Sequence, residues 1–384
     1  MYLLVCFPDV SNCWRGHFTK VIPCKIHSSF RRPTYAQMAQ TMSTYPFPYS
    51  QAARLDPRIK IPRPAIDPAL APILDSCLLP EELNIGLMRS YSASEEGDTA
   101  VNQSDSIINS APHLKYKEFL VPGPRGNNSL VLSVFMPKEP TSAALPALYH
   151  IHGGGMVAGD RFSGVAELLD IMKGIECVFL SVEYRLAPET RAPGPAEDCY
   201  AGLVWTSENA ASIGIDPAQI VILGSSGGGA LAAAMCLMAR DRQVPIIPVK
   251  GQMLLSPMLD DRCDTISDQQ FEYGSPWCGV SNRMAWAHVM GQDRGTNKTT
   301  QYQSPSRATD LSNLPSTYID AAECEVFRDP AVSYAMNMWR CGSTCELHVW
   351  PGAFHLFDGI DNPSVPLIHA AVTAKQNWLN RMFS

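Results

Sequence analysis

The sequence carries little charge and no cluster of positive charge. Charged residues make up 17% of its 384 residues, and 30 Lys and Arg stand against 37 Asp and Glu, which gives a net charge of −7 at pH 7. Proteins that bind nucleic acids gather Lys and Arg where the phosphates lie. The composition therefore argues against a nucleic-acid partner. Hydrophobic residues make up 46% of the chain, which is enough for a packed core.

Long hydrophobic runs and paired cysteine motifs are also missing. No window approaches the roughly 18 apolar residues that a membrane-spanning helix needs. The opening residues MYLLVCFPDV lack the basic start and the cleavage site of a secretory signal. The 12 cysteines show neither C-x-x-C spacing nor neighbouring pairs of histidines, so neither a zinc site nor a disulfide framework is expected. We expect a cytoplasmic protein with no transmembrane segment, no metal and no cofactor.

Residues 1–50 differ in composition from the rest of the chain. They hold five basic residues and one acidic residue, Asp9, among many Ser, Thr and Pro. We expect a poorly ordered or atypical N-terminal extension, which would be shorter if Met38 or Met42 were the true start. A transit-like presequence, which would direct the protein to an organelle, is the alternative.

From residue 130 onward, strand-like and helix-like stretches alternate. Strands are expected at 130–136, 145–152, 177–184, 219–224, 251–256, 316–322 and 345–350, and helices at 162–174, 195–213, 229–241, 328–342 and 364–382. This alternation predicts the α/β class, with a mostly parallel central sheet flanked by helices. Residues 51–384 are expected to form a single domain.

Two segments fall outside this alternation and are predicted to form a helical cap. Residues 51–110 are rich in proline, and residues 260–312 lie between two predicted strands and carry several large side chains. Insertions at the carboxyl edge of a parallel sheet commonly cover a ligand crevice. Within the second segment, Trp277, Trp286 and Met284 are candidates to line that crevice or, equally, to belong to the core.

The stretch ILGSSGGGALAA sets two serines among glycines, between a predicted strand and a predicted helix. Only Ser226 has glycines both two residues before it and two residues after it, at Gly224 and Gly228, and so satisfies the pattern G-x-S-x-G. In such a turn a strand passes abruptly into a helix, and side chains at the two flanking positions would collide. The pattern predicts that Ser226 is a nucleophile at a strained turn. A simple Gly-rich connector is the alternative.

A second glycine-rich stretch, HIHGGGMVAGD, follows another predicted strand. Attack by a serine on an ester carbonyl places negative charge on oxygen, which backbone N–H groups stabilise where no side chain blocks them. We expect the oxyanion donors to be Gly153 and Gly154, with Gly227 as the third. His152 is expected to have a structural hydrogen-bonding role, and Gly155 completes the motif.

A serine nucleophile needs a histidine base, which in sheets of this kind comes last in the chain order serine, acid, histidine. His348 lies inside a predicted strand and His369 lies on the terminal helix. His355 lies in a turn just past a strand end, from which a side chain can reach over the edge of the sheet. His355 is therefore the predicted base.

The acid of such a triad should follow the strand that ends at residue 322. Three carboxylates lie there, at Glu323, Glu325 and Asp329. Asp329 stands at the start of the next predicted helix, where a carboxylate is suited to capping. These considerations leave Glu325 and Glu323 as the two candidates.

Taken together, these motifs resemble the hormone-sensitive-lipase-like branch of the α/β-hydrolases. The resemblance covers residues 115–382 and rests on HGGG, EYRLAPE, GSSGGG, ECEVFRDP and PGAFHLF. It implies the α/β-hydrolase fold, with Glu325 at the acid position and His355 as the histidine. Three departures, at Ser225, Gly227 and Leu356, stand where the branch usually has Asp, Ala and Gly. A glutamate as the acid resembles fungal members, among them esterases of secondary metabolism.

The residues and the resemblance together predict a serine esterase. It would cleave carboxylic esters of small or medium acyl groups through an acyl-enzyme, using a triad of Ser226, Glu325 and His355 and no cofactor. The same machinery acting as an amidase, lactonase or acyltransferase is the nearest alternative. A small-ligand receptor without catalysis is a more distant one. A homodimer is neither favoured nor excluded by the sequence.

Overall fold

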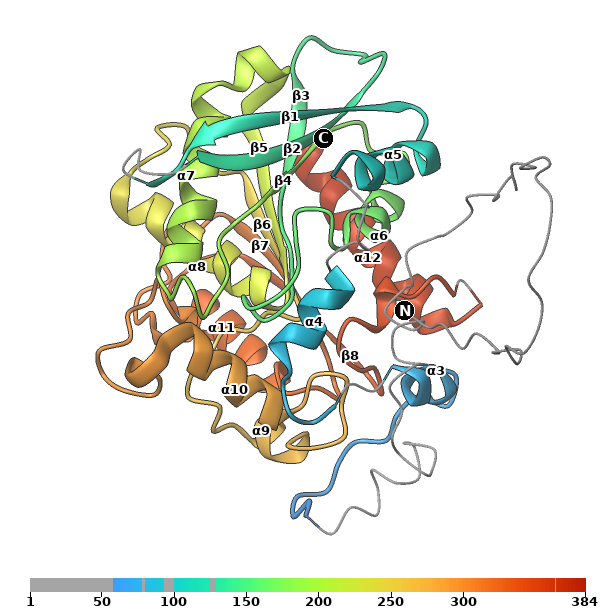
Figure 1. The fold of residues 1–384 in the computed structure, drawn as a ribbon, viewed down its shortest axis with the longest axis vertical. Helices are drawn as coiled ribbons and strands as arrows, with labels where there is room; N and C mark the ends of the chain where they lie inside the picture. Colours follow the sequence, from blue (N-terminus) through green and yellow to red (C-terminus); the bar gives the residue numbers. More distant parts are fainter. Residues whose placement is uncertain (1–57, 78–79, 93–99, 125–128, 363) are drawn as a thin grey trace, which may run out of the picture. The chain divides into compact units, whose positions relative to one another are not determined.

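In the computed structural model, an eight-stranded sheet forms the centre of the fold (Figure 1). The strands are β1 (Leu114–Pro122), β2 (Ser129–Pro137), β3 (Leu145–Ile151), β4 (Val178–Val182), β5 (Ile215–Ser225), β6 (Gly251–Leu255), β7 (Ser316–Ala322) and β8 (Cys345–Trp350). They lie side by side in the order β1-β2-β4-β3-β5-β6-β7-β8. Strand β2 is antiparallel to both of its neighbours, and all the other pairs are parallel. The predicted mostly parallel sheet is confirmed.

The structure describes residues 58–77, 80–92, 100–124, 129–362 and 364–384. All of them belong to the unit Pro33–Ser384. The extension predicted for residues 1–50 lies outside the described residues, and its nature stays a prediction.

The strands expected from the sequence do not include β1, which forms one edge of the sheet. Lys115 and Lys117 are exposed, whereas Leu114 and Val121 are buried. This strand pairs with β2 alone and carries charged side chains, as edge strands commonly do. The alternation of apolar and charged residues was the signal that could have identified it.

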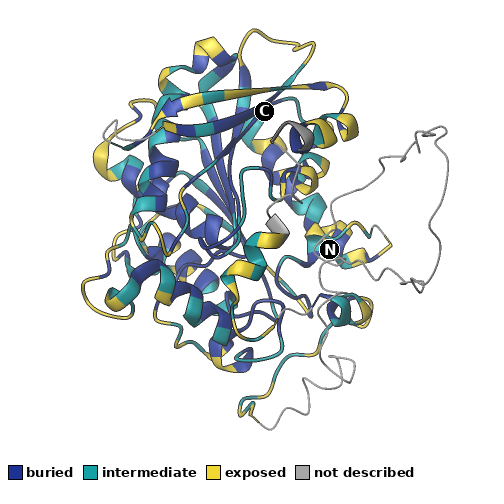
Figure 2. Ribbon diagram, viewed as in Figure 1, coloured by how far each residue is buried: buried dark blue, intermediate teal, exposed yellow. Residues whose placement is uncertain are grey.

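Helices cover both faces of the sheet, as predicted. The helices α7 (Gly194–Glu208), α8 (Gly227–Arg242) and α11 (Arg328–Arg340) contribute to one core cluster, and α6 (Val165–Ile171) and α12 (Pro366–Phe383) contribute to a second. Successive residues of β5 divide between the two clusters, with Ile222 in the first and Leu223 in the second. Figure 2 shows the buried strands between helices whose outer sides are exposed.

The two segments predicted as a cap contain short helices. The first segment holds α3 (Ala71–Ser76), α4 (Ile85–Ser92) and α5 (Ala100–Ser110), and the second holds α9 (Ile266–Gln270) and α10 (Gly279–Met290). The two segments are joined where the Ser281 hydroxyl donates a hydrogen bond to the Glu81 carbonyl at 2.8 Å. Helix α5 instead packs against β1 and α6. The assignment of both segments to a cap stays a prediction.

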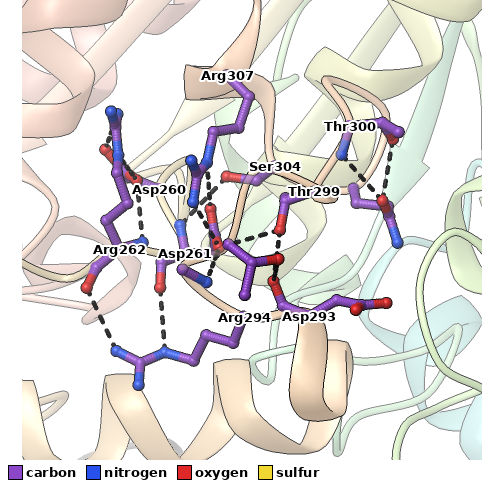
Figure 3. A network of polar contacts seen from close by, with 12 residues as sticks. Asp260, Asp261, Arg262, Asp293, Arg294, Thr299, Thr300, Ser304 and Arg307 are labelled. Atoms are coloured by element: carbon purple, nitrogen blue, oxygen red, sulfur yellow. Dashed lines mark hydrogen bonds and ion pairs between the residues drawn. The ribbon is translucent and has the colours of Figure 1, made fainter.

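A buried carboxylate organises the second of these segments, as Figure 3 shows. Asp261 is fully buried, and its oxygens accept hydrogen bonds from Nε of Arg307 at 2.8 Å and from the backbone N–H of Gly295 at 2.6 Å. Burial favours the neutral acid, but the hydrogen bonds from Arg307 and Gly295 outweigh it and lower the pKa of Asp261. The ionised carboxylate therefore ties residues 295–307 to the segment that follows β6.

We predict that Asp261→Ala lowers the free energy of unfolding by about 3 kcal/mol, because it leaves the largely buried Arg307 guanidinium without its partner. Urea unfolding at neutral pH measures this change. The matched control is Asp170→Ala, which removes an exposed ion pair with Lys173 and should leave the midpoint unchanged. Equal midpoints for the two variants would contradict the role given to Asp261.

Candidate active site

Ser226 occupies the sharp turn between β5 and α8. Its backbone has φ 55° and ψ −119°, a conformation that costs energy for a residue with a side chain. A Cβ atom at Gly224 would overlap the carbonyl oxygen of Gly228, and one at Gly228 would overlap the carbonyl oxygen of Ile151. Backbone segments approach so closely on both sides of Ser226 that only glycine fits at these two positions.

The glycine-rich loop after β3 lies against Ser226. A Cβ at Gly153 would be 3.5 Å from the Cβ of Ser226. The loop then turns through Gly154 and Gly155, whose φ angles of 100° and 61° favour glycine. A Cβ at Gly227 would be 2.9 Å from the backbone nitrogen of Gly155, so the loop and the first turn of α8 are in direct contact. Two separate backbone segments therefore meet beside the serine.

Arg89 on α4 links the glycine-rich loop to the segment 187–189 by hydrogen bonds and an ion pair. Its Nε donates to the carbonyl of Val157 at 2.8 Å, and its Nη2 donates to the carbonyl of Ala187 at 2.8 Å. The guanidinium also forms an ion pair with Glu189 at 2.8 Å. The motif segment EYRLAPE thus supports the glycine-rich loop through one arginine from residues 51–110, a role that the sequence did not reveal.

His152 holds the start of the same loop. Its ring is fully buried and stacks on Tyr184 with ring centres 4.1 Å apart. Nδ1 donates to the carbonyl of Gly153 at 2.8 Å, and the Tyr184 hydroxyl donates to the carbonyl of His152 at 2.9 Å. Burial lowers the pKa of His152, so the ring is neutral. These contacts join His152 to the backbone of the loop, and its structural role stays a prediction.

Ser226, His355 and Glu325 form a continuous chain of hydrogen bonds. Nδ1 of His355 lies 2.5 Å from Oε2 of Glu325, and Nε2 lies 3.1 Å from Oγ of Ser226. Because a carboxylate only accepts, Nδ1 carries the proton and Nε2 is left to accept from the serine hydroxyl. Glu325 is fully buried, and only 3% of Ser226 and 5% of His355 are exposed. The arrangement can remove the hydroxyl proton in a largely dry site.

The other oxygen of Glu325 is held by the backbone. Oε1 accepts a hydrogen bond from the N–H of Ala322 at 2.7 Å, at the end of β7. The ring of Phe327 packs edge-on against His355, with centres 5.2 Å apart. The acid and the base are therefore each fixed by a second contact.

The rival candidates have other partners. Glu323 accepts from the backbone N–H of Gly352 at 2.8 Å, and so holds the turn that leads to His355. His348 lies 2.9 Å from Glu346 on β8, and His369 is exposed on α12. Asp329 accepts from the backbone N–H of Ser267 at 2.7 Å. Of these candidates, the structure brings only Glu325 and His355 together with the serine.

The segment 260–312 contacts the glycine-rich loop through a tryptophan. A Cβ at Gly155 would be 2.6 Å from the Cη2 atom of Trp277, so the edge of that ring lies next to the loop backbone. Trp277 is almost completely buried, Trp286 is fully buried in the core and Met284 is half-buried. Of the three candidate lining residues, Trp277 has a direct contact with the loop beside Ser226.

The departures from the motif pattern have different local settings. Leu356 has φ 53°, in the left-handed region that favours glycine, which explains in steric terms why glycine is usual there. Ser225 ends β5 and pairs with Leu255 of β6. Neither position removes a contact among Ser226, His355 and Glu325.

Within the part of the chain that the structure describes, no group of three or more His, Cys, Asp or Glu side chains is arranged to hold a metal ion. None of the described helices is long and apolar enough to cross a membrane.

Comparison with known proteins identifies the family of this chain. Residues 148–359 match the family described by its alpha/beta hydrolase fold. The chain belongs to this family. Both the predicted fold class and the resemblance drawn from the motifs are thereby confirmed for this α/β-hydrolase.

Several named relatives of this α/β-hydrolase are esterases. It is 30% identical to "Carboxylesterase NlhH" of Mycobacterium tuberculosis over 77% of this chain and 89% of that protein. The solved structure "Bacterial Heroin Esterase" is 30% identical, with a TM-score of 0.72, over 83% of this chain and 98% of that one. A structure of fungal esterases from Rhizomucor miehei shares the fold, with a TM-score of 0.70 and 24% identity, over 84% of this chain and 98% of that one.

Proposed function

We propose that this α/β-hydrolase cleaves carboxylic esters of small or medium acyl groups through a Ser226–His355–Glu325 triad. The family and its named esterase relatives make the chain a carboxylic ester hydrolase. The observation that carries the proposal is the unbroken hydrogen-bond chain from the Glu325 carboxylate through both nitrogens of His355 to the Ser226 hydroxyl.

In the first half of the reaction, the Ser226 hydroxyl attacks the ester carbonyl carbon and its proton passes to Nε2 of His355. Glu325 keeps the proton on Nδ1 and stabilises the imidazolium that forms. The C–O bond to the alcohol then breaks as His355 returns the proton to the leaving oxygen. The products of this half are a free alcohol and an acyl group on Ser226.

Charge on the carbonyl oxygen is stabilised by backbone N–H groups at Gly153, Gly154 and Gly227. The support for this assignment is the contact between the glycine-rich loop and the first turn of α8 next to Ser226. A helix N-terminus adds a favourable partial positive charge. Because the donors are backbone groups, the Gly227 that replaces the usual alanine of the motif leaves them in place.

In the second half, water gives a proton to His355 and attacks the acyl carbon. The serine then leaves and takes the proton back, and the carboxylic acid is released. The same steps with an alcohol in place of water would transfer the acyl group instead. Hydrolysis is favoured because the named relatives of the chain are esterases.

The proposed preference for small or medium acyl groups is supported by the side chains around the serine. Trp277 lies against the loop at Gly155, and Phe327 packs against His355. Ser226 itself is 3% exposed. A rigid ring near the loop, another against the base and a serine with little exposed surface favour a compact acyl group over a long chain. A role in secondary metabolism stays a prediction.

A panel of p-nitrophenyl esters tests the proposed substrate class. We expect kcat/KM to be greatest for the acetate, butyrate or hexanoate ester, and about a hundredfold lower for the palmitate ester, since one misfitting chain can cost that much. Ser226→Ala should remove turnover of all of them. A maximum at palmitate would contradict the assigned acyl size, and unchanged turnover in the alanine variant would contradict the assigned nucleophile.

Two glutamates that lie two residues apart provide a matched pair of variants. Glu325→Gln is expected to lower kcat by about a thousandfold with little change in KM, because an amide cannot hold the proton on Nδ1 of His355. Glu323→Gln changes the same chemical group but only weakens the contact with Gly352, so kcat should stay within about threefold. Steady-state kinetics on p-nitrophenyl butyrate measures both. A larger loss at Glu323 than at Glu325 would reverse the assignment.

A further inference from the structure

A lysine is buried in the body of the fold, away from water. Lys375 on α12 has 2% of its surface exposed. Its Nζ lies 3.2 Å from Oδ2 of Asp320 and also contacts Oδ2 of Asp358. Burial alone would lower the pKa of Lys375, but the two carboxylates outweigh it and raise the pKa, so the ammonium ion is retained.

Both carboxylates belong to segments that carry members of the proposed triad. Asp320 lies in β7, whose end leads directly into the turn that holds Glu325. Asp358 lies in the short 3₁₀ helix Phe357–Gly359, which follows His355 with only Leu356 between them. One ammonium ion therefore bridges the segment of the acid and the segment of the base.

Asp320 is also connected by hydrogen bonds to the backbone around the serine. Ser256, the residue after β6, donates its N–H to the carbonyl of Asp320 at 2.9 Å and lies 3.3 Å from that residue's Oδ1. The preceding residue, Leu255, accepts a hydrogen bond from the N–H of Ser226 at 2.8 Å. Asp320 is thus linked to the turn that fixes the serine as well as to Lys375.

The bridge is poorly explained by stability alone. Taking three charged groups out of water is costly, and well-packed apolar residues often stabilise a fold as well or better. Burial raises the pKa of Asp320 to about 6 in spite of the nearby ammonium. What a charged bridge adds is geometry, because an ammonium ion held between two carboxylates fixes the separation of the segments that carry them.

We infer that Lys375 is a positioning residue: by bridging Asp320 and Asp358 it holds the Glu325 turn and the His355 loop at the separation that lets His355 reach Ser226. The inference rests on the proposed function. It assigns Lys375 no contact with the substrate. Substrate binding should therefore be insensitive to its loss, whereas the chemical step should not be.

The test is Lys375→Met, which keeps the length and apolar stem of the side chain but removes the ammonium. We expect kcat per active site to fall by about tenfold or more with KM within about twofold, the pattern of an interaction needed only for the chemical step. Active sites are counted by the stoichiometry of fluorophosphonate labelling, so unfolded molecules do not enter the value. Lys173→Met is the matched control, since Lys173 is 79% exposed in an ion pair with Asp170, and it should keep the wild-type kcat.

A second variant covers the case in which Lys375→Met does not fold. Asp358→Asn removes one charge but keeps a hydrogen-bond acceptor and the pair between Lys375 and Asp320. It should lower kcat by about threefold to tenfold, again with unchanged KM. Wild-type kcat in a folded Lys375→Met protein overturns the inference, as does wild-type kcat in Asp358→Asn if only that variant folds. A parallel rise in KM would also overturn it, because it would indicate a general distortion of the site.

The two proposals fail in different ways. If the wild-type protein neither turns over esters nor reacts with the fluorophosphonate, the proposed function fails and this inference fails with it. If the wild-type protein is active and Lys375→Met is equally active per labelled site, only the role of Lys375 is lost.

Discussion

The strained turn at Ser226 is the constraint to which the surrounding structure is fitted. A residue with a side chain is held at φ 55° between a strand and a helix, and that conformation lasts only where its surroundings determine it. Glycines at 224 and 228 give the room, and the carbonyl of Leu255 accepts from the serine N–H. The serine carbonyl in turn accepts from the N–H of Met258. Strands β5 and β6 and the loop after β3 therefore converge on one residue.

A few charged residues are buried at points where they fix the geometry of the fold. Asp261 is held by Arg307. Asp320 and Asp358 are both held by Lys375. Glu325 is held by His355 and by a backbone N–H. In each case a buried carboxylate links segments that are distant in sequence. Removal of one partner of such a group is more damaging than loss of an exposed ion pair, because the remaining charge stays buried. The low overall charge of the chain thus coexists with strict electrostatic requirements inside it.

Local sequence patterns could predict the parts of the site that depend on local backbone geometry. The turn at Ser226 and the loop at Gly153 each need glycine for steric reasons that act within a few residues, so their motifs are visible in the chain. The choice between Glu323 and Glu325 could not be made from residue type, because both are glutamates in the same turn. It depends on the direction in which each side chain points. Lys375, Asp320 and Asp358 come from three separate elements, and no spacing rule links them. Strand β1 lies before the region in which strands and helices alternate, so that alternation could not predict it. Its position at the edge of the sheet follows only from the structure.

The central claim is that Ser226 is an activated nucleophile, and its reaction with a fluorophosphonate tests this most directly. The account predicts that the intact mass of the protein rises by one phosphonyl group, that the modified peptide contains Ser226, and that Ser226→Ala stays unmodified. A folded wild-type protein that gains no mass, or that is modified equally in the alanine variant, would contradict the account.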